Sequence, residues 1–329
     1  MAENLWDVVI IGAGPAGLAA AIYTARDRYK TAVLDKFMAG GQITTTNRIE
    51  NYPGIERIDG QTLIETMQRQ AENFGAQILP GREVTSLQRR PDGLIHASCG
   101  RETYVARAVI VAVGSTYRKL GIPGEEQFRN AGAGVSYCGT CDAPFFRDKV
   151  VVTVGGGNTA IEETLHLTKY ARKVTLIHRR DEFRASKVMV EELSAKAAEP
   201  NSNLIIRTRT TPVAVQGKGR VESVKLRDTV TNREEDYPCD GVFIFVGTVP
   251  GTGFLRGFVN MTPAGFVECD GMFLRTSTPG VFVAGDCRVG AGMQLATAVG
   301  DGVNAAVLLK EYFRDPAWWA QPVAASEGY

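Results

Sequence analysis

Two stretches of the chain share one order of apolar run, glycine turn and helical pattern. In the first, residues 6–11 are nearly all apolar, residues 12–17 contain three glycines, and residues 18–23 continue with apolar side chains and a tyrosine. An apolar run that closes on glycine and opens a helical pattern predicts a buried strand, a tight turn and a helix. A second strand is expected at residues 30–35, ending on Asp35.

The same order returns in the second half of the chain. Residues 150–154 form an apolar run, residues 155–160 carry three more glycines, and a helical pattern follows through Leu167. The next strand is expected at residues 173–177. Two such units predict an α/β fold with two Rossmann-like dinucleotide-binding domains.

Other apolar runs indicate that the second unit is inserted into the first. Strands are expected at residues 108–114 and 242–247, and the first unit resumes with a strand at residues 280–286 and a helix at residues 294–313. The predicted organisation is a first dinucleotide-binding domain in two parts, at residues 1–117 and 249–314, a second such domain inserted at residues 118–248, and an aromatic tail at residues 315–329.

Composition narrows the function classes. The 329 residues are 44% hydrophobic, which is enough for more than one core, and the net charge of +1 gives no field that would attract nucleic acid or a membrane surface. The uncharged stretch 8–25 is interrupted by three glycines and a proline, so it is interpreted as a strand, turn and helix rather than a membrane or signal segment. A cytoplasmic location is therefore expected, and six cysteines there do not imply a structural disulfide framework.

The first glycine turn has the spacing of a dinucleotide site. Gly12 allows the tight turn, Gly14 lets the backbone approach a pyrophosphate, and Gly17 lets helix and strand pack closely. Asp35, at the end of the next strand, can accept hydrogen bonds from a ribose. The alternative is a tight turn that binds nothing.

The chain's strongest chemical signal is the cysteine pair Cys138 and Cys141, with Asp142 directly after it. Two cysteines three residues apart can close a redox-active disulfide, and a helix N-terminus favours the thiolate. A zinc half-site, buried cysteines, haem attachment and chance are the alternatives. A zinc site would need a second ligand pair, and haem attachment would need a histidine directly after Cys141, and the sequence has neither. The other cysteines are isolated and are interpreted as core or surface residues: Cys99, Cys239, Cys269 and Cys287. No metal site is expected.

The second glycine turn predicts a different nucleotide. Gly155, Gly157 and Ala160 repeat the phosphate-binding spacing, but no acidic residue follows the next strand. Basic residues stand there instead: His178, Arg179, Arg180 and Arg184. Guanidinium groups can hold a 2′-phosphate by bidentate bonds, which selects NADPH over NADH. A solvated basic face is the alternative.

Nearly the whole chain, from about residue 6 to 312, resembles the low-molecular-weight flavin thioredoxin reductases. The resemblance is carried by the cysteine pair, by the segment 178–185, and by residues 40–45, 50–54 and 285–286. It implies an FAD flavoenzyme, in which Cys141 exchanges electrons with the flavin, Cys138 attacks the partner disulfide and Asp142 is the general acid. It further implies thioredoxin as partner and a homodimer. The FAD-contacting residues expected on this resemblance are Gln42, Asn51, Gly114, Asp286 and Gln294.

Two departures from that family concern the electron donor. Met293 precedes Gln294 where the family commonly has arginine, and the chain continues past its last helix with Trp318 and Trp319. These indoles are expected either to pad a surface or to stack on the flavin where a nicotinamide would dock. The second option suits the family's ferredoxin-linked branch, so ferredoxin is the alternative donor to NADPH. A ferredoxin–NADP oxidoreductase and a redox sensor are rival functions that would not need the cysteine pair or Asp142, respectively.

Overall fold

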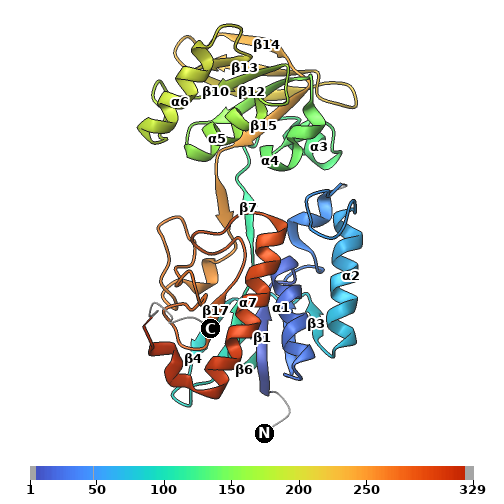
Figure 1. Ribbon diagram of the computed structural model, residues 1–329, viewed down its shortest axis with the longest axis vertical. Coiled ribbons are helices and arrows are strands. Elements are labelled where there is room, and N and C mark those ends of the chain that lie inside the picture. The colour runs from blue at the N-terminus through green and yellow to red at the C-terminus, as the bar shows by residue number, and fades with distance from the viewer. Residues whose placement is uncertain (1–4, 47, 323–329) are drawn as a thin grey trace. The chain divides into compact units, whose positions relative to one another are not determined.

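A computed structural model describes residues 5–46 and 48–322 (Figure 1). The chain divides into two compact units. Unit 1 comprises residues 1–116 and 249–329, and unit 2 comprises residues 117–248 between them. Two short strands, β7 (Ser115–Tyr117) and β16 (Thr248–Pro250), carry the chain from one unit to the other and back, and they pair with each other. The last residues of the predicted tail, 323–329, lie outside the described residues.

Unit 1 is built on a seven-stranded sheet with the order β3-β2-β1-β6-β5-β4, in which β17 also pairs with β6. The pairings β1·β2, β1·β6, β2·β3 and β6·β17 are parallel, whereas β4·β5 and β5·β6 are antiparallel. The strands span Leu5–Ile11 (β1), Thr31–Asp35 (β2), Gln77–Pro80 (β3), Ser86–Arg89 (β4), Ile95–Cys99 (β5), Glu102–Val111 (β6) and Val281–Val283 (β17).

Three helices of unit 1 pack side by side, α1 (Pro15–Arg26) between α2 (Gly60–Asn73) and α7 (Leu295–Arg314) (Figure 1). Proline at the first position of α1 suits a helix start, because its missing N–H would have no partner there. Alanines along α1 and α7 allow the two helices to approach closely over one core cluster. A second cluster includes side chains of β4, β5 and the loop around the 3-10 helix η3 (Gly253–Leu255).

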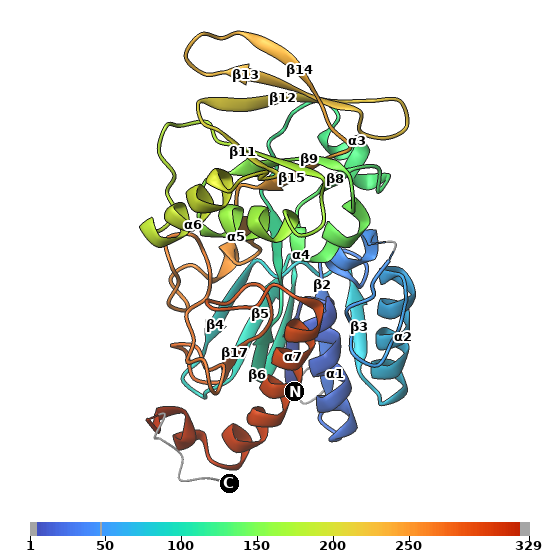
Figure 2. The same cartoon turned by 45° about the horizontal axis from the view of Figure 1, so that its top comes forward.

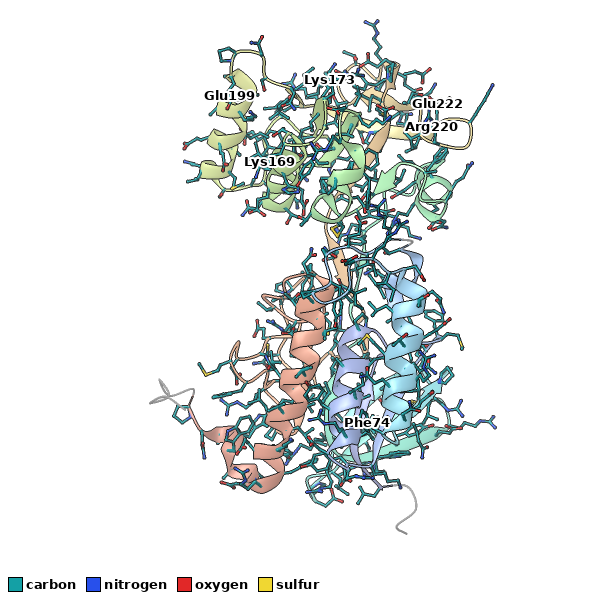
Figure 3. The ribbon with its side chains drawn as sticks, turned by 45° about the vertical axis from the view of Figure 1, so that its right-hand side comes forward. Phe74, Lys169, Lys173, Glu199, Arg220 and Glu222 are labelled. Atoms are coloured by element: carbon teal, nitrogen blue, oxygen red, sulfur yellow. A yellow bond between two sulfur atoms is a disulfide. The ribbon has the colours of Figure 1, made fainter. Side chains whose placement is uncertain are left out.

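Unit 2 holds a five-stranded parallel sheet with the order β11-β10-β9-β15-β8. Its strands span Val135–Ser136 (β8), Val150–Gly155 (β9), Lys173–Ile177 (β10), Leu204–Arg207 (β11) and Gly241–Phe245 (β15). One core cluster joins this sheet to α5 (Asn158–Leu167) and α6 (Lys187–Ala198). In Figure 3, Lys169 and Lys173 mark the connection from α5 to β10, and Glu199 marks the end of α6.

A three-stranded antiparallel sheet covers the other face of the five-stranded sheet (Figure 2). Its strands are β12 (Thr210–Gln216), β13 (Ser223–Asp228) and β14 (Glu234–Pro238). Arg220 and Glu222 lie in the β12–β13 connection (Figure 3). Short helices complete unit 2: α3 (Glu125–Asn130), α4 (Gly139–Asp142) and the 3-10 helix η2 (Ala143–Phe146).

Candidate functional site

The first glycine turn joins β1 to α1, and two of its glycines are required by the protein's own packing. Gly12 has a φ of +104°, and a Cβ there would lie 2.4 Å from the carbonyl oxygen of Ala112. A Cβ on Gly17 would lie 1.8 Å from the carbonyl oxygen of Gly12. No side chain fits at either position without moving backbone.

Gly14 differs from its neighbours because nothing in the protein requires it to be glycine. Its φ of −77° and ψ of −176° are open to any residue. A Cβ there would meet no atom closer than the carbonyl oxygen of Gly40 at 3.8 Å. Space kept free beside a helix N-terminus is what a pyrophosphate needs, so this turn fits a dinucleotide.

Asp35 and Gly114 lie at the same end of the sheet as this turn. The Asp35 carboxylate accepts the backbone N–H of Ala13 at 2.6 Å and that of Phe37 at 2.8 Å. Each of its oxygens still has a lone pair for a further donor, such as a ribose hydroxyl. Gly114 has a φ of +62°, its carbonyl accepts the N–H of Gly251, and a Cβ on it would meet nothing within 4 Å.

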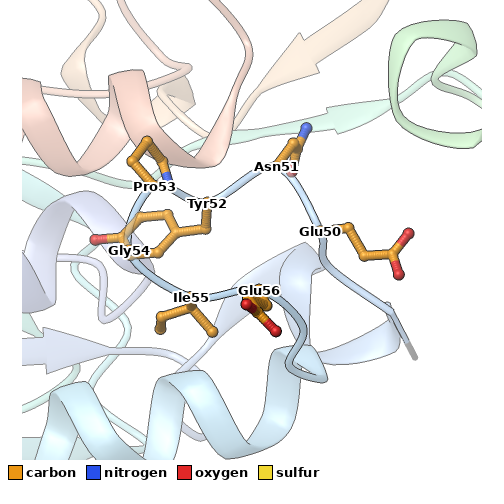
Figure 4. Close-up of a pocket in the computed structure, with 7 residues that line it drawn as sticks. All are labelled: Glu50, Asn51, Tyr52, Pro53, Gly54, Ile55 and Glu56. Atoms are coloured by element: carbon orange, nitrogen blue, oxygen red, sulfur yellow. The ribbon is translucent and has the colours of Figure 1, made fainter.

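The structure brings the other residues expected near the flavin together in unit 1. The Gln42 side chain donates to the carbonyl oxygen of Ser115, whose hydroxyl lies 3.9 Å from the sulfur of Met293. The Asn51 amide donates to the Gln294 side chain at 3.4 Å, and Gln294 also begins α7 with a capping box. Asn51 belongs to a loop that curls around a shallow hollow between residues 50 and 56 (Figure 4).

Asp286, just after β17, has a buried carboxylate oxygen with no partner. Among the described residues, its Oδ1 is the one buried side-chain nitrogen or oxygen atom without a hydrogen bond. Burial raises the pKa of Asp286 to about 6, helped by the nearby Asp301 carboxylate and opposed by Arg288. A buried acceptor left without a donor is costly, so this position fits a ligand hydroxyl such as that of a ribityl chain.

Asp301 and Arg288 hold the turn that carries Asp286. Asp301 accepts the N–H of Gly285 at 2.9 Å and receives two bonds from the Arg288 guanidinium, at 2.6 and 2.9 Å. Sequence reasoning missed this pair, because neither residue belongs to a recognisable motif.

The second glycine turn, between β9 and α5, repeats the division of roles seen in the first. A Cβ on Gly155 would lie 2.5 Å from both the Ala160 side chain and the carbonyl oxygen of Phe245. Gly157 has ordinary extended backbone, with a φ of −100° and a ψ of 179°, and a Cβ there would meet nothing within 4 Å. Here too, the protein's own packing does not require one glycine, and the free space beside it fits a ligand that approaches the backbone.

His178 does not join the basic cluster to which the sequence assigned it. Only 6% of its surface is exposed, its ring packs against Gly156, and its Nε2 lies 3.1 Å from the carbonyl oxygen of Glu182. Burial lowers the pKa of His178, which favours the neutral imidazole. His178 therefore supports the glycine turn by packing against Gly156, and its part in phosphate binding stays a prediction.

Arg179, Arg180 and Arg184 are exposed, as the phosphate-binding prediction requires. The backbone N–H of Arg184 donates to the carbonyl oxygen of Gly156 at 2.7 Å, which ties this segment to the glycine turn. Within residues 5–46 and 48–322, none of the three guanidinium groups has a carboxylate partner. Three guanidinium groups without carboxylate partners, beside a glycine turn with phosphate-binding spacing, suit an anionic ligand.

Cys138 and Cys141 form a disulfide at the start of α4. The Cys138 sulfur accepts the backbone N–H of Cys141 at 3.1 Å, so a thiolate formed at Cys138 would keep a donor. Asp142 accepts the Ser136 hydroxyl at 2.6 Å. Burial raises the pKa of the Asp142 carboxyl, although Ser136 and Arg129 oppose the shift. A raised pKa makes this carboxyl a better proton carrier, which suits a general acid beside a disulfide.

The tryptophan tail packs on unit 1 against side chains of β17 and α7. Trp318 and Trp319 lie in the 3-10 helix η4 (Pro316–Ala320), and the Trp319 ring lies 4.9 Å from that of Phe282 and 5.3 Å from that of Tyr312. Arg275, whose side chain is 5% exposed, donates to the carbonyl oxygens of both tryptophans.

The ring and hydrogen-bond contacts of both indoles are thus with β17, α7 and residues 273–276, not with the residues expected at the flavin. The physical reason is the direction of α7. Its 20 residues, Leu295–Arg314, carry the chain about 30 Å from Gln294 before the tail begins.

In the described part of the chain, no group of three or more potential ligands could hold a metal ion. No helix of residues 5–46 and 48–322 is long and apolar enough to cross a bilayer. Burial raises the pKa of the remaining thiols well above neutral, to about 11 for Cys99 and Cys269 and about 12 for Cys239 and Cys287, so they are poor nucleophiles.

Comparison with known proteins agrees with this geometry. Residues 6–302 match the family model described as pyridine nucleotide-disulphide oxidoreductase. The chain is 42% identical to a thioredoxin reductase of Treponema pallidum, over 94% of this chain and 98% of that protein. It is 44% identical to one of Mycolicibacterium smegmatis, over 93% and 96%. The structure of a thioredoxin reductase from Streptococcus pyogenes covers 95% of this chain, which covers 99% of that one, with a TM-score of 0.87 and 36% identity. The ferredoxin-dependent alternative gains no support from these comparisons.

Proposed function

Because this chain belongs to the pyridine nucleotide-disulphide oxidoreductases, as a low-molecular-weight bacterial-type thioredoxin reductase, we propose that it passes electrons from NADPH through FAD to its own dithiol and then to thioredoxin. NADPH supplies two electrons and one proton. The thioredoxin disulfide takes up two electrons and two protons, so the second proton comes from solvent. The observation that carries the proposal is the Cys138–Cys141 disulfide in a chain with two glycine turns that each keep one ligand-facing glycine.

FAD is assigned to unit 1. Gly14 and the N-terminus of α1 would hold its pyrophosphate, Asp35 its adenosine ribose, and Asp286 its ribityl chain. When bound, FAD would supply the redox chemistry that carries two electrons from a hydride donor to a disulfide. Gln42 and Asn51, which the structure brings to the same region of unit 1, would contact the flavin ring.

NADPH is assigned to unit 2. Gly157 and the N-terminus of α5 would hold its pyrophosphate, and Arg179, Arg180 and Arg184 would hold its 2′-phosphate. The second glycine turn still has Gly157 at the position that faces the ligand, which favours a working nucleotide site over a vestigial one. The tail, being packed elsewhere, leaves no observation that favours a ferredoxin donor.

The dithiol carries the final transfer. The Cys138 thiolate, supported by the N–H of Cys141, would attack a sulfur of the thioredoxin disulfide and form a mixed disulfide, while Asp142 gives its proton to the leaving thiolate. Cys141 would then attack Cys138, which releases reduced thioredoxin and restores the internal disulfide. We further propose that the protein is a homodimer, on the family relationship. We also propose that it is cytoplasmic, because disulfides in the cytosol are mostly catalytic, as this one is proposed to be.

The experiment is an anaerobic titration of the purified protein with NADPH, followed by oxidised thioredoxin, with the flavin absorbance recorded throughout. We expect Gly14→Val to lose flavin, and Gly157→Val to keep flavin but resist reduction by NADPH. Gly271→Val is the control, because Gly271 is an exposed glycine with ordinary backbone and free space around it. Cys138→Ser should keep flavin reduction but lose thioredoxin reduction.

Three results would count against the proposal. A Gly157→Val protein reduced by NADPH at the normal rate would remove NADPH from unit 2. Normal thioredoxin turnover by Cys138→Ser would remove the dithiol mechanism. Faster flavin reduction by reduced ferredoxin than by NADPH would change the donor.

A further inference from the structure

Thr140, one of the two residues between the cysteines, is held by a carboxylate from another helix. Its backbone N–H donates to Oε2 of Glu163 at 2.7 Å, and its hydroxyl donates to Oε1 of the same residue at 3.0 Å. Glu163 lies on α5, which packs against α4. Both oxygens of this carboxylate are thus engaged by one residue of the redox turn.

Gly139, the other residue between the cysteines, makes room for this contact. Its φ lies outside the left-handed region, so its backbone does not require glycine. A Cβ on Gly139 would lie 2.2 Å from Oε2 of Glu163 and 3.3 Å from its Cβ. The glycine is therefore explained by the close approach of the Glu163 side chain.

The contact determines which donors a thiolate can use. At this turn the Cys141 N–H points to the Cys138 sulfur at 3.1 Å, but the Thr140 N–H is taken by Glu163. Donors and positive charge stabilise a thiolate, whereas a nearby carboxylate destabilises it. Other ionisable groups near the turn include Asp142 on α4, which accepts the Ser136 hydroxyl, and Arg129 on α3, which acts on Asp142.

We propose that Glu163 is a positioning residue that keeps the Cys138–Cys141 pair strongly reducing. It binds the Thr140 N–H and places a negative charge beside the turn, so that the Cys138 thiolate is not overstabilised. A dithiol whose reduced form is less stable gives up its two electrons and two protons more readily. The inference rests on the proposed redox role of the pair and adds the residue that adjusts its strength.

The test measures the dithiol–disulfide equilibrium of the FAD-loaded protein. The protein is equilibrated anaerobically in glutathione buffers, quenched with acid and alkylated, and the peptide with both cysteines is quantified by mass. We expect Glu163→Ala to shift the equilibrium toward the dithiol by at least about tenfold, which is about 30 mV for a two-electron couple. Glu163→Gln, which keeps an acceptor but loses the charge, should shift it less in the same direction.

Two further variants separate this role from general damage to α5. Glu162→Gln removes the same charge from the exposed neighbouring position and should leave the equilibrium unchanged. Gly139→Ala should displace the Glu163 carboxylate and reproduce the shift without altering α5, and it should add nothing in a Glu163→Ala background. This second route also tests the inference if Glu163→Ala fails to fold.

The outcomes distinguish the inference from the proposed function. If the wild-type pair does not exchange with glutathione at all, its redox role fails and the inference fails with it. If the pair exchanges but Glu163→Ala, Glu163→Gln and Gly139→Ala shift the equilibrium less than about twofold, or toward the disulfide, only the role of Glu163 is overturned.

Discussion

Replacing Asp286 with asparagine is expected to stabilise the flavin-free protein, and by an amount that grows with pH. The carboxylate has a buried oxygen with no partner, and burial raises its pKa to about 6 from the ordinary value of 3.8. A carboxyl whose pKa is higher in the folded state binds protons more tightly there. Its protonation therefore supports folding fully below the unfolded pKa, and this support is lost as pH rises through about 6.

The two pKa values give the size of the effect. At pH 8 both states are ionised, and the difference of about two units corresponds to a penalty of about 3 kcal/mol on the folded wild type. At pH 5 the folded carboxyl is mostly protonated, and the same relation gives about 1.6 kcal/mol. The asparagine variant carries no such penalty, so its advantage should grow by about 1.4 kcal/mol between pH 5 and pH 8.

Urea unfolding of both flavin-free proteins at the two pH values measures this difference. A constant effect of the new amide on stability cancels when the two pH values are compared. The variant should also bind FAD more weakly, because a ribityl hydroxyl loses a charged acceptor. A stability difference that does not change with pH, or one that shrinks as pH rises, would refute the reasoning.

Two other substitutions test the site and the tail. Asp142→Asn should lower thioredoxin turnover by about a hundredfold or more, while flavin reduction by NADPH stays normal. Because burial raises the pKa of Asp142, wild-type turnover should fall as pH rises through that pKa, whereas turnover by Asp142→Asn should not. The same pH profile in both proteins would exclude the acid role. Truncation after Arg314 should lower the free energy of unfolding by about 2 kcal/mol or more, because two packed indoles are lost and Arg275 loses its carbonyl partners, and calorimetry measures this. The flavin spectrum should not change, and an altered spectrum would place the tail at the cofactor after all.

Much of the fold could be predicted because its signals are local. The two glycine turns and the apolar runs before them set the bounds of β1 and β9 to within one residue and those of α1 and α5 to within three. β6 begins at Glu102, earlier than residue 108 where its apolar run starts, because the preceding residues pair with β5 while remaining partly polar. The sheet β12–β14 was not predicted, since a strand such as Glu234–Pro238 has no apolar run to mark it.

The candidate site was only partly predictable, because some contacts depend on where side chains point. His178 stands next to two arginines in sequence, but its ring turns inward onto Gly156 while the arginines stay exposed. The position of Trp318 depends on the direction in which α7 runs from Gln294, and no spacing in the sequence reveals that direction. Glu163 reaches Thr140 only because α5 packs against α4, and nothing in its local sequence marks that contact.

The two parts of the mechanism differ in how well their polar groups are satisfied before any partner binds. At the redox turn, Asp142, Thr140 and the Cys138 sulfur all have hydrogen-bond partners within the protein. In unit 1, Asp286 keeps a buried oxygen without a donor. The redox turn therefore needs no ligand to hold its geometry, whereas at neutral pH unit 1 carries an electrostatic cost that a bound hydroxyl donor would remove. FAD should for this reason stabilise unit 1 by more than its contact area alone suggests, and the excess should disappear when Asp286 is made asparagine.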